Sequence, residues 1–136
     1  MNRVCPLGTY RASICLPARV EQVGRAREFV TATLGTEHPC AGVLQLIVSE
    51  LVTNSIVHSR SGWRDAGTVT LALAGNSGRV RVAVTDEGGP TLPRLREADS
   101  CAESGRGLYM VDALAAAWNC ARDTSGATTT WAEVIG

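Results

Sequence analysis

Two polar side chains spaced four residues apart, Glu50 and Asn54, are the first candidates for chemistry in this sequence. The apolar residues around them recur at helical spacing, so both side chains project from one side of a helix, one turn apart. They border the apolar sector of that helix, where a carboxylate and an amide are costly without a partner. A hydrated Mg²⁺ is one such partner, because magnesium takes oxygen ligands and is usually completed by substrate phosphates.

In that arrangement Asn54 would supply its side-chain oxygen to the metal, and Glu50 would hold a water molecule or accept a proton. The alternative is a helix whose polar edge is only solvated, since glutamate and asparagine are common at such edges. His58 stands one turn beyond Asn54, and its position predicts a helix-end residue instead of a ligand.

Asp86 stands where a predicted strand ends, and Gly88 and Gly89 follow it. The glycines remove side chains just beyond the carboxylate, so a flat ligand could approach the backbone there. A carboxylate in this position can accept a hydrogen bond from an exocyclic amine such as that of adenine. The alternative is an aspartate that serves only the turn, because aspartate before glycine is common in turns.

The segment Gly105-Arg106-Gly107 stands immediately before a helical pattern that begins at Leu108. Backbone N–H groups at a glycine-containing helix start can bind phosphates. The segment matches neither the P-loop pattern nor the strand-to-helix dinucleotide fingerprint, so by itself it is weak evidence.

Three consecutive threonines, residues 128–130, lie in the last predicted strand. Because side chains alternate along a strand, Thr129 and Trp131 share a face. A hydroxyl from Thr129 near Asp86 could bind a base, or a water molecule that the two share. Threonine is also common in strands for its β-propensity alone, which is the other interpretation.

Helices and hairpins must position these residues. Helical spacing of apolar residues predicts helices over residues 20–34, 39–59 and 108–117, and alternation predicts strands over residues 10–16, 68–74, 79–85, 119–123 and 128–135. Residues 1–8 are expected to be a loose terminus and residues 60–67 a loop. Early helices, antiparallel hairpins and one later helix predict an α+β fold, a two-layer α/β sandwich with three helices on one face of a mixed, mostly antiparallel sheet.

The composition limits the classes of function. A length of 136 residues fits a single domain, and 13 basic residues balance 13 acidic ones, so no basic surface for nucleic acid is expected. No uninterrupted apolar run approaches about 18 residues, and no basic segment precedes an apolar one at the N-terminus. The 5 cysteines are scattered without a C-x-x-C pair, which indicates a reducing cytoplasm and no zinc site. The sequence predicts a cytoplasmic domain without direct nucleic-acid or membrane partners.

In their order along the chain, these motifs resemble the nucleotide-binding boxes of the GHKL ATPases, a superfamily with gyrase-type, histidine-kinase and mismatch-repair members. E-x-x-x-N on a helix matches the N box. D-x-G after a strand, G-x-G-L at a helix start and a threonine-rich last strand match the three G boxes. The size and details look most like the stand-alone bacterial anti-sigma factors that are serine-protein kinases. The similarity runs from about Thr9 to Val134, and the four boxes in order are specific although each is weak alone.

The resemblance implies a Bergerat-type ATP-binding fold with ATP and Mg²⁺ as cofactors. Asn54 would coordinate Mg²⁺, and Glu50 would be the general base or would position water. Asp86 would bind the adenine amine. Gly88 would let the base approach the backbone, and Thr129 would support the base. Four further residues would wrap the phosphates: Gly105, Arg106, Gly107 and Leu108.

The resemblance also implies a short ATP lid over residues 88–105. The reaction would be transfer of the γ-phosphate to a serine of an anti-sigma-factor antagonist. The partners would be a sigma factor, such an antagonist, or both, and this family often forms homodimers.

Two departures from the family pattern affect the predicted activity. Gly88-Gly89-Pro90 gives no D-x-G-x-G, and Glu103 stands where kinases of this family often carry an arginine. A carboxylate directed inward there would repel the γ-phosphate, although Arg106 could substitute for the arginine. Glu103 therefore favours the alternative, an ATP-gated regulator that binds its partners without phosphotransfer, whereas the intact Glu50 and Asn54 favour the serine kinase, which is the main prediction. A detached histidine-kinase catalytic domain is a third alternative, disfavoured because no phospho-acceptor helix precedes residue 9.

Overall fold

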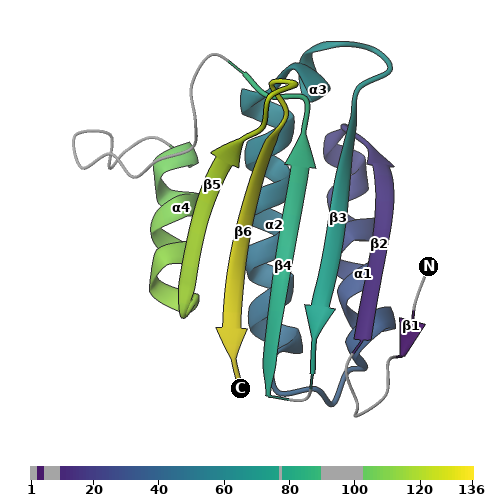
Figure 1. Cartoon of the computed structure of the whole chain (residues 1–136), viewed down its shortest axis with the longest axis vertical. Coiled ribbons are helices and arrows are strands. Elements are labelled where there is room, and N and C mark those ends of the chain that lie inside the picture. Colours follow the sequence, from purple (N-terminus) through teal and green to yellow (C-terminus); the bar gives the residue numbers. More distant parts are fainter. Residues whose placement is uncertain (1–2, 5–9, 77, 90–102) are drawn as a thin grey trace.

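A computed structural model describes residues 3–4, 10–76, 78–89 and 103–136 of the chain, in which one sheet carries its helices on one face (Figure 1). The strands are ordered β1-β2-β3-β4-β6-β5 in the sheet, and every neighbouring pair is antiparallel. Their bounds are β1 Arg3–Val4, β2 Tyr10–Pro17, β3 Thr68–Gly75, β4 Arg79–Asp86, β5 Ala117–Arg122 and β6 Thr128–Ile135.

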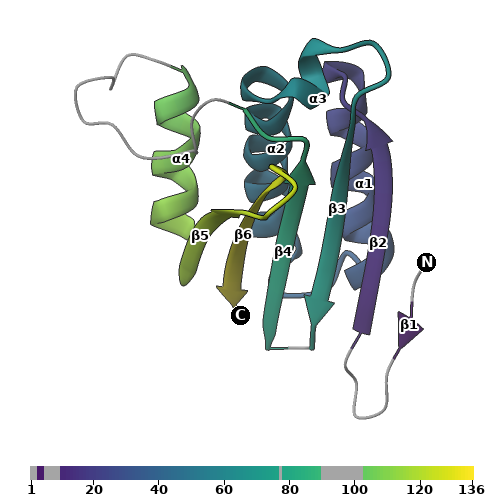
Figure 2. The same ribbon diagram turned by 45° about the horizontal axis from the view of Figure 1, so that its top comes forward.

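Three long helices cover the sheet: α1 (Val23–Leu34), α2 (Ala41–His58) and α4 (Glu103–Leu114). The 3₁₀ turn η2 (Val20–Gln22) leads into α1, and the short helix α3 (Arg60–Trp63) follows α2. Two views of the molecule place α2 between α1 and α4, behind the centre of the sheet (Figures 1 and 2). The predicted α+β, two-layer architecture is therefore confirmed.

The core lies between α2 and the helix-facing side of the central strands. Along β3 and β4, alternate residues are buried, and these are valines and leucines except for Asp86 at the end of β4, while the residues between them are more exposed. Each fully buried side chain of this kind contributes about 1.5–3 kcal/mol relative to an exposed one. The fully buried residues of α2 that meet these strands are Leu44, Ile47, Val48, Leu51 and Val52.

Helix α2 is also long and apolar enough, on average, to cross a membrane. The sequence pattern gave no such prediction because Glu50 and Asn54 interrupt the apolar run. Within the described part of the chain its buried residues pack into the core. Packing in the middle of the domain therefore explains the apolar composition of this helix.

Helix α4 begins at Glu103 and ends at Leu114, whereas the sequence predicted a helix from Leu108 to Ala117. The segment Gly105-Arg106-Gly107 consequently lies inside the first turns of the helix and not before it. Glycine costs only about 1 kcal/mol in a helix. Burial of Leu108 and Val111 in the next turns is sufficient to offset that cost.

Two further elements occur where the sequence predicted none. Helix α3 occupies part of the predicted loop 60–67, and its first turn is capped by Ser59, whose hydroxyl accepts from the N–H of Ser61 at 3.2 Å. Strand β1 lies in the predicted loose terminus, where Arg3 pairs with Arg11 of β2. Both segments are too short to give a periodic signal in the sequence.

Candidate functional site

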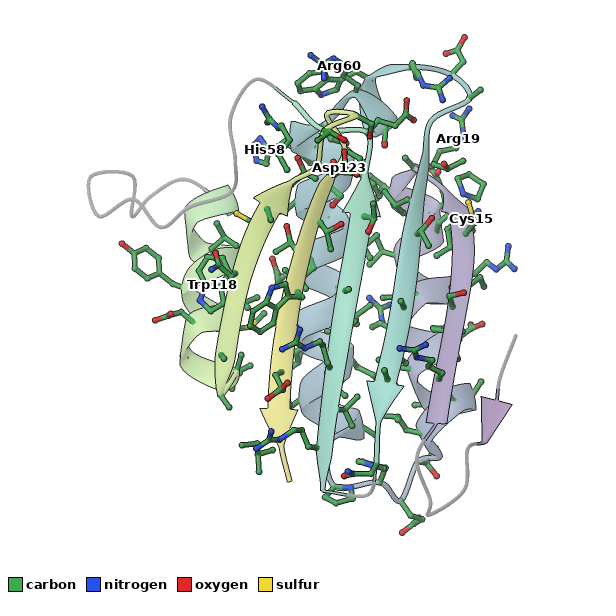
Figure 3. All side chains as sticks on the ribbon, viewed as in Figure 1. Cys15, Arg19, His58, Arg60, Trp118 and Asp123 are labelled. Atoms are coloured by element: carbon green, nitrogen blue, oxygen red, sulfur yellow. The ribbon has the colours of Figure 1, made fainter. Side chains whose placement is uncertain are left out.

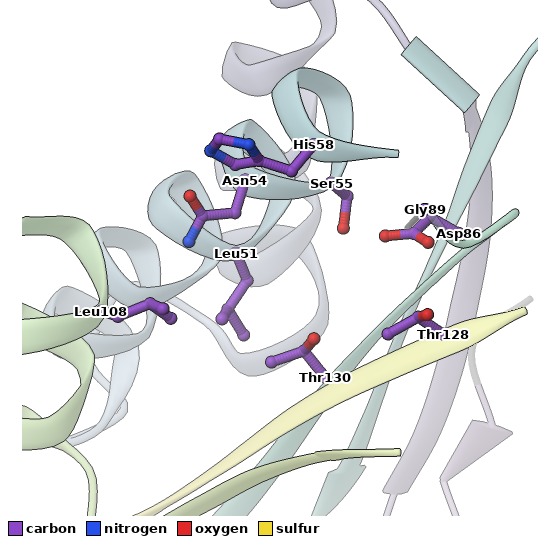
Figure 4. Close-up of a pocket in the computed structure, with 9 residues that line it drawn as sticks. All are labelled: Leu51, Asn54, Ser55, His58, Asp86, Gly89, Leu108, Thr128 and Thr130. Carbon is purple, nitrogen blue, oxygen red and sulfur yellow. The ribbon is translucent and has the colours of Figure 1, made fainter. Parts of the chain in front are cut away.

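A pocket opens between α2, α4 and the ends of β4 and β6 (Figure 4). The empty space within its lining is about 350 Å³, part of which is open to solvent. Leu108 lines it from α4, and its predicted contact with phosphates stays a prediction. The complete lining is Leu51, Asn54, Ser55, His58, Asp86, Gly89, Leu108, Thr128 and Thr130.

Asp86 is the last residue of β4, and its side chain is buried on the strand side of this pocket. One carboxylate oxygen accepts the N–H of Gly88 at 2.7 Å, and the Ser55 hydroxyl of α2 donates to the carboxylate as well. Burial raises the pKa of Asp86, while these two donors and the charge of Arg122 oppose the increase. A carboxylate has about four acceptor positions, so this one keeps capacity for a donor in the pocket.

Two polar atoms in the pocket lining are buried and have no hydrogen-bond partner among the described residues. They are Nδ2 of Asn54 and Oγ1 of Thr128. Asn54 lies on the helix side of the pocket, and Thr128 lies on the strand side, paired directly with Asp86 (Figure 4). A buried donor or acceptor without a partner costs about 1–3 kcal/mol, so both atoms indicate a ligand with complementary polar groups.

The backbone after Asp86 fits tightly against two neighbouring segments. Gly88 has a φ of +81°, and a Cβ atom there would overlap the carbonyl oxygen of Gly126 in the β5–β6 turn. A Cβ atom on Gly89 would overlap the carbonyl oxygen of His58. The carbonyl of Gly88 also accepts the N–H of Arg60 at 2.8 Å. The sequence predicted that Gly88 lets a ligand approach the backbone. In the structure, the absence of a side chain at Gly88 allows close packing against Gly126, and it is Gly89 that lines the pocket.

We expect Gly88→Ala to lower the free energy of unfolding by roughly 2–4 kcal/mol, because alanine is strained at this φ and its methyl group meets a backbone carbonyl. Urea denaturation followed by circular dichroism measures the change. Gly42→Ala in α2 is the control, since nothing lies within 4 Å of its added Cβ. That control should keep or raise stability, and equal losses in the two variants would contradict the prediction.

The structure corrects the placement of the predicted threonine. Thr129 points to the open face of the sheet, where its hydroxyl bonds to that of Thr85 at 2.8 Å. Thr128 and Thr130 are buried and line the pocket. They share the helix-facing side of β6 with Ala132 and Val134, and this apolar pair was the signal in the sequence that could have identified them.

Glu50 is half-buried on α2, one turn before Asn54, and is not among the residues that line the pocket. Gly105, Arg106 and Gly107 are placed by their backbone alone, in the first turns of α4. The first four N–H groups of a helix have no acceptor within it, so those of residues 103–106 take their acceptors from outside the helix, and an anion is one such acceptor. Most of the predicted lid, residues 90–102, lies outside the described residues.

His58 and Ser55 also line the pocket, although the sequence predicted only a helix end for His58. In the described ranges, no three His, Cys, Asp or Glu side chains gather as metal ligands. A divalent cation in this pocket would therefore depend on oxygen atoms of the ligand in addition to the Asn54 side chain.

Comparisons with known proteins give one matching family and several similar structures, two of which follow. The family model of the histidine kinase-like ATPase domain matches residues 16–132. A structure of the RsbU and RsbW domains of Rv1364c from Mycobacterium tuberculosis has 21% sequence identity and a TM-score of 0.65, over 92% of this chain and 31% of that chain. A histidine kinase domain from a blue-light activated histidine kinase of Erythrobacter litoralis has 22% identity and a TM-score of 0.49, over 88% of this chain and 61% of that chain.

This chain thus spans less than two thirds of the length of either structure. The first likeness supports the fold. No curated protein sequence matches the chain.

Proposed function

The chain belongs to the histidine kinase-like ATPase family, and we propose that its pocket binds ATP together with Mg²⁺. This family match also confirms the resemblance to the GHKL ATPases that the sequence motifs indicated. The observation that carries the proposal is the set of polar groups with unused hydrogen-bonding capacity in one pocket: the partly bonded Asp86 carboxylate, and the Thr128 hydroxyl and Asn54 amide N–H, which have no partner among the described residues.

The strand side of the pocket fits the adenine base. Asp86 is an acceptor, so it suits the exocyclic amine of adenine and opposes the carbonyl oxygen that guanine carries at the same ring position. Thr128 lies directly beside Asp86 across the sheet, and its free hydroxyl can bond to a ring nitrogen or to a water molecule on the base. Leu51 and Leu108 supply apolar surface for the face of the ring.

The helix side of the pocket fits the phosphates. The Asn54 amide can donate its unpartnered N–H to a phosphate oxygen while its oxygen remains available as a metal ligand. The N–H groups of the first turn of α4 have no acceptor within the helix and offer further donors for phosphate. Bound Mg²⁺ would neutralise phosphate charge and fix the orientation of the γ-phosphate.

We further propose that the chain acts in the cytoplasm as an anti-sigma-factor-like serine kinase. It would transfer the γ-phosphate of ATP to a serine of an anti-sigma-factor antagonist, with Glu50 accepting the proton of the serine hydroxyl. Support comes from the motif resemblance and from the structural likeness to a chain with an RsbW domain. The alternative is an ATP-gated partner-binding protein without phosphotransfer. Two observations favour it: Glu50 does not line the pocket, and Glu103 begins α4.

Labelled ATP distinguishes the two functions. The purified chain is incubated with γ-labelled ATP, Mg²⁺ and an anti-sigma-factor antagonist from the same organism, and phosphoserine on the antagonist is measured. We expect Glu50→Gln to keep ATP affinity while transfer falls by about 10²–10⁴-fold, the usual contribution of a general base.

The control for this experiment is Glu28→Gln, which makes the same charge change on an exposed residue of α1. Transfer by Glu50→Gln at the rate of this control would contradict the assignment of Glu50 as the base. ATP binding without any phosphoserine in the unsubstituted protein would establish the ATP-gated alternative.

A further inference from the structure

Arg122, the last residue of β5, lies in cross-strand register with two residues of the pocket. It pairs with Thr128 on β6, and Thr128 pairs with Asp86 on β4. The guanidinium Nη2 of Arg122 donates to the carbonyl oxygen of Gly89, which also lines the pocket. Figure 3 shows the neighbouring Asp123 at the same end of the sheet as His58 and Arg60. Arg122 therefore reaches across β6 to the chain that leaves β4.

This contact completes the support of the backbone next to Asp86. The N–H of Gly88 bonds to the Asp86 carboxylate, the carbonyl of Gly88 accepts from Arg60, and the carbonyl of Gly89 accepts from Arg122. Successive backbone groups after the aspartate are thus fixed from α3 and from β5. A bond from a charged donor to a carbonyl is stronger than a neutral one, so the arginine is a firm anchor.

The charge of Arg122 also acts on Asp86. Among the described residues, the titratable or charged groups near this carboxylate are Glu87, His58 and Arg122. Glu87 is bound by Arg64 at 2.6 Å, and its charge raises the pKa of Asp86, whereas Arg122 lowers it. His58 is exposed on the rim of the pocket. Burial is the largest effect on the pKa of Asp86, and the hydrogen bonds from Ser55 and Gly88 oppose it first; Arg122 adds a permanent positive charge that acts in the same direction as these bonds.

We propose that Arg122 is a positioning residue for the base: it holds the backbone at Gly89 and keeps the Asp86 carboxylate ionised, so that the pocket selects an exocyclic amine over a carbonyl. This inference rests on the proposed binding of an adenine nucleotide. An ionised carboxylate only accepts hydrogen bonds, so it pairs with the amine of adenine and repels the carbonyl oxygen of hypoxanthine. A protonated carboxyl group can donate to that carbonyl, and the preference is then reduced.

The test compares ADP with inosine diphosphate (IDP), which carries a carbonyl in place of the amine. Isothermal titration calorimetry with Mg²⁺ at neutral pH gives both dissociation constants. We expect the unsubstituted protein to prefer ADP by at least about 10-fold, the value of one unmatched polar contact. Arg122→Gln should reduce this preference by about 3- to 10-fold, chiefly through weaker ADP binding, and Arg122→Lys should retain most of it.

The pH dependence separates this role from a purely structural one. Because loss of Arg122 raises the pKa of Asp86, the preference of Arg122→Gln for ADP should recover as the pH rises. Arg79→Gln is the control, since it removes the same charge from an exposed residue at the other end of β4. It should bind both nucleotides as the unsubstituted protein does.

Parallel weakening of ADP and IDP in Arg122→Gln, with an unchanged ratio at every pH, would overturn the inference. An equal loss of preference in Arg122→Lys and Arg122→Gln would overturn the charge role. If the glutamine variant proves unstable, Arg122→Lys still tests the charge role against the unsubstituted protein: a retained preference for ADP supports the proposal, and a lost preference overturns it. Failure of the unsubstituted protein to bind either nucleotide would instead overturn the proposed function itself.

Discussion

Asp86→Asn is expected to weaken ADP and ATP binding by roughly 10- to 100-fold, while the nucleotide-free protein becomes at least as stable as before. The asparagine oxygen can still accept the N–H of Gly88, a bond of 2.7 Å in the structure. Its amide nitrogen, however, is a donor and would face the amine of adenine. The pocket therefore loses an acceptor that the base requires.

Asp86→Asn should lower nucleotide affinity but should not lower the stability of the nucleotide-free protein. Burial raises the folded-state pKa of Asp86 above its ordinary value of 3.8, so between these two values the folded state binds more protons than the unfolded state. The contribution of this group to stability is then greatest at low pH and is lost as the pH rises through the folded-state pKa. Asparagine does not ionise, so the variant does not lose this stability as the pH rises.

Two measurements check this prediction together. Calorimetry gives nucleotide affinity, and urea denaturation from about pH 4 to pH 8 gives stability across the titration of the carboxyl group. The difference between the urea midpoints, Asp86→Asn minus the unsubstituted protein, should increase as the pH rises over that range. Reduced stability of the variant at neutral pH would show that the carboxylate is mainly structural, and full ADP affinity would remove Asp86 from the base site.

Asn54→Ala is expected to abolish the Mg²⁺-dependent part of ATP binding, a loss of at least about 100-fold in the presence of the metal. The substitution removes the side-chain oxygen proposed as a metal ligand. It also removes the amide N–H that has no partner among the described residues and is proposed to donate to phosphate. Affinity in EDTA should change much less, because the contacts to the base remain.

Titrations with Mg²⁺ and with EDTA measure these two affinities separately. The control is Thr53→Ala, which alters an exposed neighbour on the same helix and should bind ATP normally. Removal of Asn54 also deletes a buried polar atom without a partner, so stability should fall by no more than about 1 kcal/mol. Equal losses of affinity with and without the metal would contradict the role of Asn54 as a ligand.

The sequence by itself determined the main elements and two of the site positions. Helical periodicity is strong around Asn54, and alternation is strong in the strand that ends at Asp86, because both segments bury one face in the core. Local pattern is sufficient in such cases, since the side chain direction follows from the position in the element. The E-x-x-x-N helix and the D-x-G strand end were therefore predictable before any tertiary contact was known.

The local sequence pattern did not identify the pocket-facing side of β6, where an aromatic residue lies on the open face of the sheet. Alternation correctly placed Thr129 and Trp131 on one face of β6, but it did not indicate which face meets the helices. In the structure the Trp131 ring lies on the open face of the sheet, with the guanidinium carbon of Arg81 at 4.0 Å from the ring centroid. The pairing register of β4 with β6 decides which threonines meet the helices, and register is a tertiary property.

Other features depended on contacts between segments far apart in the sequence. Arg122 reaches Gly89 because β6 lies between β4 and β5 in the sheet, an order that no local spacing encodes. Gly88 is required by the carbonyl of Gly126, which only the folded chain brings next to it. The sequence specified the periodic elements because their burial patterns are local, whereas the tertiary structure decided the partners of each site residue because those contacts join distant segments.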